Sequence, residues 1–204
     1  MRFALRALGA LSLSLLSAPA LANSAGITGN SGKAQGQTCN SCHLGGSAPT
    51  VELSGPAELA PGATGQYTLT VRGGAAKVGG MNVAVDNTAA KLQPGTGSQT
   101  LGQELTHKGP QPFTGGELRF DFSLVAPSTP GTVKLFGAGN SANGDFSSDG
   151  DRGSSTTLSV TVTGAKTGDE GNDLQGGCST TGGASLFLFA MAAASLPLLR
   201  RRWS

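Results

Sequence analysis

A run of alternating apolar and polar residues near the middle of the chain constrains its fold more than any other feature. From Leu118 to Leu124 the order is Leu-Arg-Phe-Asp-Phe-Ser-Leu, so every second side chain is apolar. Because successive side chains of a β-strand point to opposite faces, the run predicts a strand with one apolar face. That face needs a second layer of structure to cover it.

The same period of two recurs elsewhere in the chain. These runs lie at residues 67–71, 81–85, 133–135 and 158–162, with weaker candidates at 50–53 and 100–105. Turn signals such as Pro61-Gly62 and Pro130-Gly131 separate the runs, and the body of the chain shows no helical period. Six to eight short strands in about 115 residues predict an all-β fold, an antiparallel β-sandwich of the immunoglobulin type over residues 47–163.

The first 22 residues have the composition of a secretory signal. Arg2 and Arg6 precede an apolar run from residue 7 to residue 16, and Ala20-Leu21-Ala22 follows as a small-residue cleavage site. The alternative, the start of a buried core helix, rarely combines a basic flank with such an exit. We expect a signal helix over residues 1–22, cleavage after Ala22, and export of a mature chain that begins near Asn23.

A second apolar segment, residues 184–199, lies near the C-terminus and is followed at once by Arg200, Arg201 and Arg202. Sixteen helical residues rise about 24 Å, slightly less than the roughly 30 Å of a bilayer's hydrocarbon core. Such a hydrophobic helix can still insert if the arginines reach the interface, and they would stay on the cytoplasmic side. A helix packed in a globular core is the less favoured alternative. Polar residues 164–177 are expected to form a flexible linker before it.

The C-terminal segment also resembles a known sorting signal. Gly176-Gly177-Cys178, the apolar run and the terminal arginines together look like the MYXO-CTERM tail of myxobacterial surface proteins. The resemblance covers roughly residues 176–204. It implies recognition by a membrane-bound sorting protease, processing near Cys178, and retention at the cell surface. We therefore expect an exported, membrane-anchored protein of the cell envelope, with residues 178–204 as its sorting and transmembrane tail.

The charge of the exported part argues against one class of partner. The chain has 14 basic and 12 acidic residues, and five of the basic residues are the arginines of the signal and the tail. Nine basic residues then stand against twelve acidic ones, a net charge near −3, with neither a basic patch nor an aromatic platform for nucleic acid. The sequence also lacks a Ser/His/Asp order, a carboxylate pair and a phosphate-binding loop, so we do not expect an enzyme.

The strongest chemical signal is Cys39-Asn40-Ser41-Cys42-His43, within the loop-like segment 23–46. C-x-x-C-H is the attachment pattern of c-type haem, in which the thiols bond the haem vinyl groups and the histidine takes an axial iron position. This attachment takes place outside the cytoplasm, in agreement with the signal. Three alternatives stay open. They are a structural Cys39–Cys42 disulfide, a thioredoxin-like redox site without its usual βαβ context, and a zinc site that would have at most three ligands here.

A haem iron held by His43 needs a sixth ligand or keeps an open position. His107, the only other histidine of the chain, is predicted at a strand end, where its side chain could face the motif. It is the candidate ligand, although a histidine in such a place is often a plain surface residue. Met81 is the other possible donor, but its place in an alternating run favours the core.

Residues 137–151 form a second polar cluster, in which Asp145, Asp149 and Asp151 lie among asparagines and glycines. Carboxylate and amide oxygens are the ligands that Ca²⁺ prefers, so these aspartates are candidate calcium ligands. Their spacing does not match an EF-hand loop. Asn, Asp and Gly are also the ordinary residues of long turns.

Several of these pieces occur together, and in order, in a second family. The Cys-x-x-Cys-His-x-Gly-Gly segment, Thr106-His107 before the strand at Phe120, and the later Gly-Ala-Gly-Asn run resemble a choice-of-anchor V domain. Such domains are similar to the Reeler type of extracellular β-sandwich. The resemblance covers roughly residues 25–163 and departs at Leu124-Val125, where an aromatic residue usually precedes the Ala-Pro pair. It implies a surface-anchored sandwich and pairs the motif with a later histidine, here His107.

Two functions follow as expectations. The main one is a surface-anchored protein that carries one covalent c-type haem for electron transfer or sensing. The alternative is a structural or adhesive surface domain in which Cys39–Cys42 is a disulfide and no haem is bound.

Overall fold

The computed structural model describes residues 23–164, and this part of the chain is built almost entirely from strands. Its elements are the 3-10 helix η1 Cys39–Ser41 and the strands β1 Leu44–Gly45, β2 Thr50–Ser54, β3 Glu58–Leu59, β4 Thr64–Arg72, β5 Val78–Val85, β6 Lys91–Pro94, β7 Ser98–Leu101, β8 Glu104–His107, β9 Gln111–Pro112, β10 Glu117–Val125, β11 Gly131–Ala142 and β12 Asp149–Val162. Within residues 23–164 no helix is long and apolar enough to cross a membrane.

The expected signal helix and C-terminal hydrophobic helix lie outside the described residues, as does the linker beyond Gly164. The same holds for the processing and anchoring residues, which are Ala22, Cys178, Arg200, Arg201 and Arg202.

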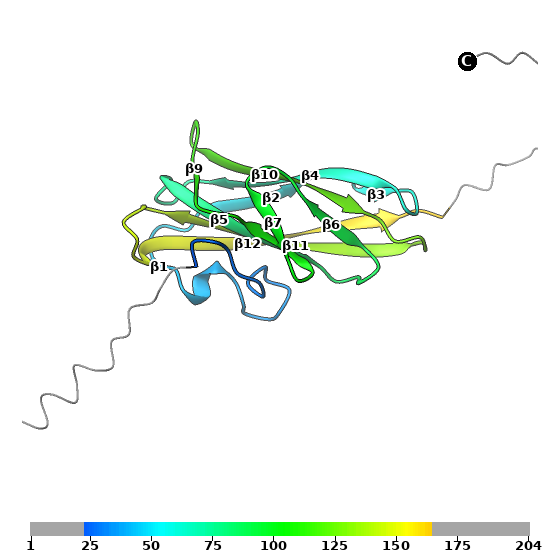
Figure 1. Ribbon diagram of the computed structural model, residues 1–204, viewed down its shortest axis with the longest axis horizontal. Coiled ribbons are helices and arrows are strands. Elements are labelled where there is room, and N and C mark those ends of the chain that lie inside the picture. The colour runs from blue at the N-terminus through cyan, green and yellow to red at the C-terminus, as the bar shows by residue number, and fades with distance from the viewer. Residues whose placement is uncertain (1–22, 165–204) are drawn as a thin grey trace, which may run out of the picture. The chain divides into compact units, whose positions relative to one another are not determined.

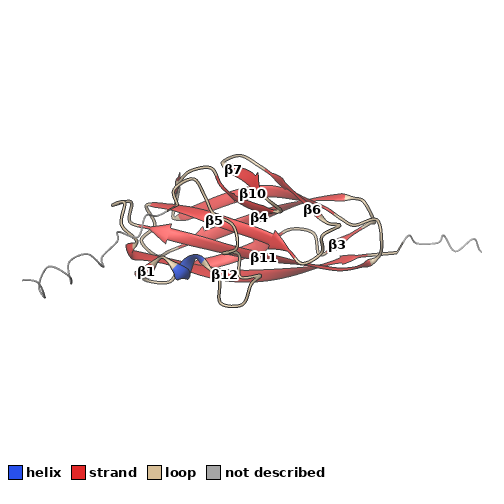
Figure 2. Ribbon diagram, turned by 60° about the horizontal axis from the view of Figure 1, so that its bottom comes forward, coloured by secondary structure: helices blue, strands red, loops and turns tan. Residues whose placement is uncertain are grey.

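The strands form two sheets that face each other as the layers of a sandwich (Figures 1 and 2). In the eight-stranded sheet, β1, β12, β11, β5, β8 and β7 lie side by side in that order, while β3 pairs with β12 and β9 with β5. The four-stranded sheet has the order β2-β4-β10-β6. Its pairings are antiparallel, and in the larger sheet only the short strands β1 and β3 run parallel to β12. The prediction of an all-β sandwich is confirmed.

The apolar core lies between the sheets and follows the alternation seen in the sequence. In β10 the apolar positions from Leu118 to Leu124 are buried, and the polar positions between them are exposed or half-buried. The antiparallel register sets Phe120 opposite Leu69 and Phe122 opposite Tyr67, whose rings stack with centroids 5.9 Å apart. Leu135 of the other sheet is fully buried in the same cluster. Large side chains from both layers thus exclude water between them, which is the main stabilising contribution of such a fold.

Two stretches differ from the expectation. Residues 137–142, whose composition is typical of long turns, continue β11, because Gly137 and Gly139 face the core and leave room for Leu69 and Val71 of the opposite sheet. Residues 100–105, expected as one strand, belong to the hairpin of β7 and β8, which turns at Gly102 with φ of +61°.

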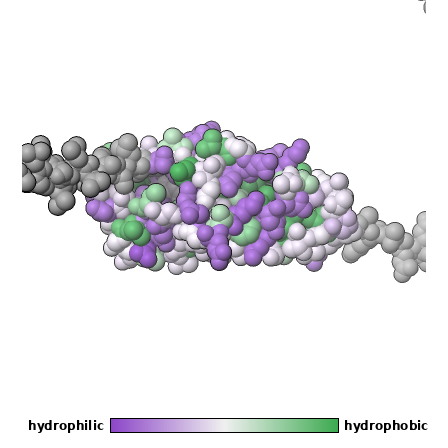
Figure 3. Space-filling view, turned by 90° about the horizontal axis from the view of Figure 1, so that it is seen from below, coloured by the Kyte–Doolittle hydropathy of each residue, from purple (hydrophilic) through white to green (hydrophobic). Residues whose placement is uncertain are grey.

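Residues 23–46 pack on the outer face of the eight-stranded sheet, beside β12 (Figure 1). The Asn30 N–H donates to Asn82 Oδ1 at 2.8 Å, and the Gly153 N–H donates to Asn40 Oδ1 at 2.8 Å. The segment therefore covers a face of the sheet that would otherwise meet solvent. Seen from this side, hydrophilic and neutral residues dominate the surface, and apolar residues form small separate patches (Figure 3).

Candidate functional site

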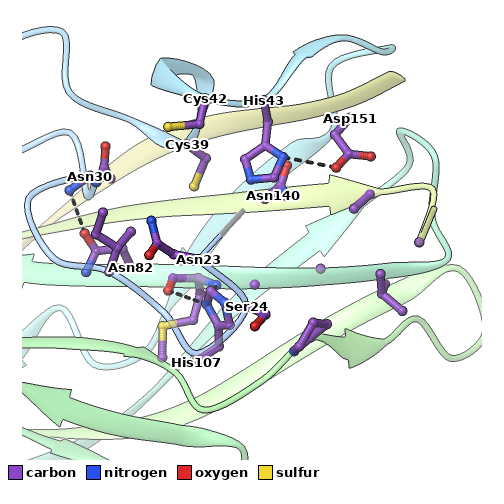
Figure 4. Close-up of a pocket in the computed structure, with 18 of the residues that line it drawn as sticks. Asn23, Ser24, Asn30, Cys39, Cys42, His43, Asn82, His107, Asn140 and Asp151 are labelled. Atoms are coloured by element: carbon purple, nitrogen blue, oxygen red, sulfur yellow. Dashed lines mark hydrogen bonds and ion pairs between the residues drawn. The ribbon is translucent and has the colours of Figure 1, made fainter. Parts of the chain in front are cut away.

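A pocket of about 470 Å³ lies between residues 23–46 and the outer face of the eight-stranded sheet. Its lining is mainly apolar, with a few polar side chains. Cys39, Cys42 and His43 lie on one side of the pocket, and His107 lies across from them (Figure 4). A mainly apolar cavity with a few convergent polar groups is typical of a site for a small organic ligand or a cofactor.

Small residues on neighbouring strands form the floor of the pocket. The register sets Gly80 of β5 opposite Asn140 of β11, so both lie on the same outer face of the sheet. A β-carbon added at Gly80 would overlap the His107 ring, and one added at Gly153 of β12 would overlap Cys39. These two glycines thus allow the histidine and the cysteine to approach the sheet closely.

The Cys-x-x-Cys-His motif begins in the 3-10 helix η1. Thr38 Oγ1 caps this turn by accepting from the Asn40 N–H at 3.3 Å, and the His43 N–H donates to the Cys39 carbonyl at 3.0 Å. Burial raises the pKa of Cys39 to about 12, with a smaller contribution from Cys42, so the Cys39 thiol is protonated at neutral pH. Cys39 is half-buried, Cys42 is exposed, and no disulfide joins them in this structure.

His43 is held by a carboxylate from the other end of the domain. Its Nδ1 lies 3.0 Å from Oδ2 of Asp151, a residue of β12 that is only 2% exposed (Figure 4). Oδ1 of the same carboxylate accepts from the Asn143 N–H at 2.8 Å. Sequence reasoning assigned Asp151 to calcium and missed this contact. The two residues are 108 positions apart, and no local pattern connects them.

His107 ends β8, as predicted, and lines the same pocket as the motif. Its Nδ1 accepts from the Met81 N–H at 3.1 Å in one tautomer and donates to the Met81 carbonyl oxygen at 3.2 Å in the other. Burial lowers the pKa of His107, the backbones of Met81 and Asn23 oppose this, and the charge of His43 lowers it further. The ring is therefore neutral at pH 7. In the tautomer whose Nδ1–H donates to the Met81 carbonyl, Nε2 carries a lone pair.

The three aspartates predicted as calcium ligands do not converge. Asp145 Oδ1 accepts from the Ser147 N–H at 2.8 Å, and its Oδ2 accepts from Asn143 Nδ2 at 3.0 Å, so this carboxylate stabilises its own turn. The Asp149 side chain is exposed, while Asp151 contacts His43. Between residues 23 and 164, no group of three or more His, Cys, Asp or Glu side chains is placed to hold a metal ion.

The pocket includes two residues that sequence reasoning did not single out. Asn140 Oδ1 is buried and has no hydrogen-bond partner among the described residues. Phe146, in the turn between β11 and β12, is 99% exposed, with φ of +66°. An asparagine in a glycine-rich run and a single phenylalanine in a polar turn carry no pattern that would mark a site. Met81, weighed as an iron ligand, is 1% exposed and part of the core cluster, as its alternating run predicts.

Comparisons with known proteins give the chain no family. No protein-family model and no curated protein matches it. Among solved structures, it is similar to the PKD domain of an M14-like peptidase from Thermoplasmatales archaeon SCGC AB-540-F20, with 18% identity, a TM-score of 0.33, and coverage of 56% of this chain and 94% of that one. A CARDB domain from Pyrococcus furiosus, in complex with di-metal ions, gives 15% identity, a TM-score of 0.32, and coverage of 60% and 92%. The bacterial hydrophobin BslA gives 14% identity, a TM-score of 0.32, and coverage of 61% of this chain and 100% of that one. Similarity at this level carries no information about function, and the resemblances to choice-of-anchor V domains and MYXO-CTERM tails stay predictions.

Proposed function

We propose that this protein is an exported surface protein whose β-sandwich carries one c-type haem, attached at Cys39 and Cys42, for one-electron transfer. One observation carries the proposal. The two thiols, His43 and His107 all line one pocket, although His107 comes from a strand far along the chain.

The residues of the pocket fit such a group in their chemistry. Thiols attach haem c, and imidazole nitrogens are strong axial ligands of its iron. His43 has its Nδ1 next to the Asp151 carboxylate, which leaves Nε2 as the nitrogen with a free lone pair. His107 offers the same free Nε2 in the tautomer whose Nδ1–H donates to the Met81 carbonyl. A cavity of about 470 Å³ is within the ordinary range for cofactor sites. The unpartnered Asn140 Oδ1 offers the polar contact that a ligand with polar groups needs.

The chain's own residues determine what the site can do. A haem bound here would supply a one-electron couple between ferric and ferrous iron. The burial of His107 keeps its ring neutral, so the ring is available to a metal at neutral pH. The pocket surface that a bound group would contact is mainly apolar. If both histidines ligate, no position is left for an exogenous ligand, which favours electron transfer over gas sensing.

The proposed location rests on the two ends of the sequence. Export through the signal of residues 1–22 would bring the thiols to a compartment where haem attachment takes place. The MYXO-CTERM resemblance of residues 176–204 supports retention at the surface by a membrane-bound sorting protease. The proposed membrane contact therefore belongs to the C-terminal tail.

The test is to produce the full chain with its signal in a host that has haem-attachment machinery. We expect a red protein whose haem survives denaturing electrophoresis and adds the mass of one haem. The double variant Cys39→Ala/Cys42→Ala should be exported but colourless, and Ser41→Ala serves as the matched control in the same turn. A colourless wild-type protein with a Cys39–Cys42 disulfide would falsify the proposal.

A second candidate is a structural or adhesive surface domain. It is favoured by the architecture, because nearly the whole described chain is a two-sheet sandwich of the kind that such domains use. In that case the η1 turn, which brings Cys42 within one turn of Cys39, would serve as a disulfide staple. The same preparation separates the two candidates, because each predicts a different covalent state of the two sulfurs.

A further inference from the structure

Asp151 is a buried carboxylate that the proposed haem attachment does not itself require. It lies in β12 at 2% exposure, opposite Gly45 of β1. Burying a charged group without partners is costly, so a carboxylate in such a place must be fully hydrogen-bonded. Both of its oxygens have a partner, which are the Asn143 N–H at 2.8 Å and His43 Nδ1 at 3.0 Å.

The contact determines which nitrogen of His43 carries the proton. An ionised carboxylate only accepts hydrogen bonds, so the His43 nitrogen beside it is an N–H donor. The other nitrogen, Nε2, then keeps its lone pair, and the ring stands at the pocket wall (Figure 4). A histidine ligand whose far nitrogen donates to a carboxylate is oriented by that bond and becomes a more basic ligand.

We propose that Asp151 is the positioning residue for His43, which fixes its ring and tautomer and lowers the reduction potential of the attached haem. This inference rests on the proposed function. Its physical reason is that an electron-rich axial ligand stabilises ferric iron more than ferrous iron. The backbone of the β11–β12 turn takes part, because Asn143 holds the other carboxylate oxygen.

Two other interpretations of Asp151 are less favoured. It does not gather with Asp145 and Asp149 as a cation site, because no such group is found among residues 23–164. It could simply fasten the segment 23–46 to the sheet, but other hydrogen bonds already do so, such as Gly46 N–H to the Asp151 carbonyl at 3.2 Å and Gly153 N–H to Asn40 Oδ1 at 2.8 Å. A staple would also not require the carboxylate to meet a histidine at the Nδ1 atom.

The experiment compares Asp151→Asn with Asp149→Asn in the haem-loaded full chain. Both substitutions remove one negative charge from the same strand, but the exposed Asp149 carboxylate does not contact His43. We expect Asp151→Asn to shift the one-electron equilibrium toward ferrous haem by about tenfold, a rise of about 59 mV in midpoint potential. Its ferric electron-paramagnetic-resonance g-values should shift too, while Asp149→Asn should match the wild type. A loaded Asp151→Asn protein with an unchanged potential overturns the inference and leaves the haem proposal standing.

A measurement on the wild type keeps the test decisive if Asp151→Asn does not fold. In the diamagnetic ferrous protein, the proton on His43 Nδ1 should give a downfield nuclear-magnetic-resonance signal that exchanges slowly with water. A His43 ring proton that exchanges as fast as that of a free imidazole overturns the inference. A wild-type protein without haem overturns the proposed function, and the inference with it, so the two failures are distinguishable.

Discussion

The outer face of the four-stranded sheet carries charged and hydroxyl side chains, whereas the outer face of the eight-stranded sheet carries small residues beneath the segment 23–46. On the first, Arg72 bonds Glu117 at 2.7 Å and Glu52 at 2.9 Å, all in contact with solvent. On the second, Gly80 and Asn140 line a pocket. The inner faces of the two sheets share one apolar core.

The difference teaches how to interpret an alternating strand. Both sheets place large apolar side chains inward, so the inward positions predict the sandwich and say nothing of the site. The residues at the outward positions are what distinguishes the two sheets. Charged residues there indicate a solvated face, because charged side chains are rarely buried without partners. Glycine, alanine and asparagine there indicate a face that another part of the molecule or a ligand covers.

The largest effect is expected from filling the pocket floor. In Gly80→Val, the new side chain would overlap the His107 ring. Overpacking of this kind costs about 1–3 kcal/mol, and we expect the variant to retain little or no haem. Urea unfolding and the haem-to-protein absorbance ratio measure the two effects. The control is Arg119→Val, which puts the same side chain on an exposed outer position of β10 and should change neither quantity. Equal losses in both variants would break the comparison between the two faces.

The sandwich was predictable from the sequence, and half of the candidate site was. Period-two runs such as 118–124 indicate strands because alternate side chains of a strand point into the core. The motif from Cys39 to His43 could be recognised because its residues are neighbours in the sequence. His107 could be placed at a strand end, but its position across from the motif depends on how β8 pairs with β5. The contact between His43 and Asp151 joins the two ends of the domain, and only the folded sheet brings them together. The short strand β6 gave no signal, because its four residues, Lys-Leu-Gln-Pro, contain only one large apolar side chain.

The next largest effect concerns the pocket wall formed by His107. If the proposed haem is ligated by both histidines, His107→Ala should keep the covalent haem but lose the low-spin spectrum of a six-coordinate iron, because the proposed second ligand is removed. The absorption spectrum of the ferric protein measures this. Lys108→Ala alters the neighbouring exposed residue and should leave the spectrum unchanged. A low-spin spectrum that persists in His107→Ala would rule out His107 as a ligand. The proposed haem contacts would then lie only on the side of the pocket that carries the Cys-x-x-Cys-His motif.

The pH dependence of stability should differ between the faces in the haem-free Cys39→Ala/Cys42→Ala chain. Burial lowers the pKa of His107 below 6.5, so the unfolded chain binds this proton more readily than the folded one. The contribution of His107 is therefore complete above about pH 6.5 and is lost as the pH falls below it. The hydrogen bond from Arg72 lowers the pKa of Glu117 below 4.5, so that contribution is lost only at still lower pH.

Urea midpoints measured from pH 8 to pH 3 check these two windows. His107→Gln should reduce the fall of the urea midpoint just below pH 6.5, and Arg72→Ala should reduce the fall below pH 4.5. A midpoint that stays constant between pH 7 and pH 5 in the parent chain would contradict the assignment of a neutral, buried His107.

The smallest effect is expected from the ion pairs on the solvated face. Arg72→Ala removes bonds to Glu117 and Glu52, but these side chains lie in solvent, with Arg72 itself 41% exposed. Exposed ion pairs contribute little, because water screens the charges and ordering long side chains costs entropy. We expect a urea midpoint at pH 7 close to that of the wild type and an unchanged haem content. A loss of stability as large as that of Gly80→Val would show that the solvated face is as sensitive to substitution as the pocket floor, and would contradict the contrast drawn between the two sheets.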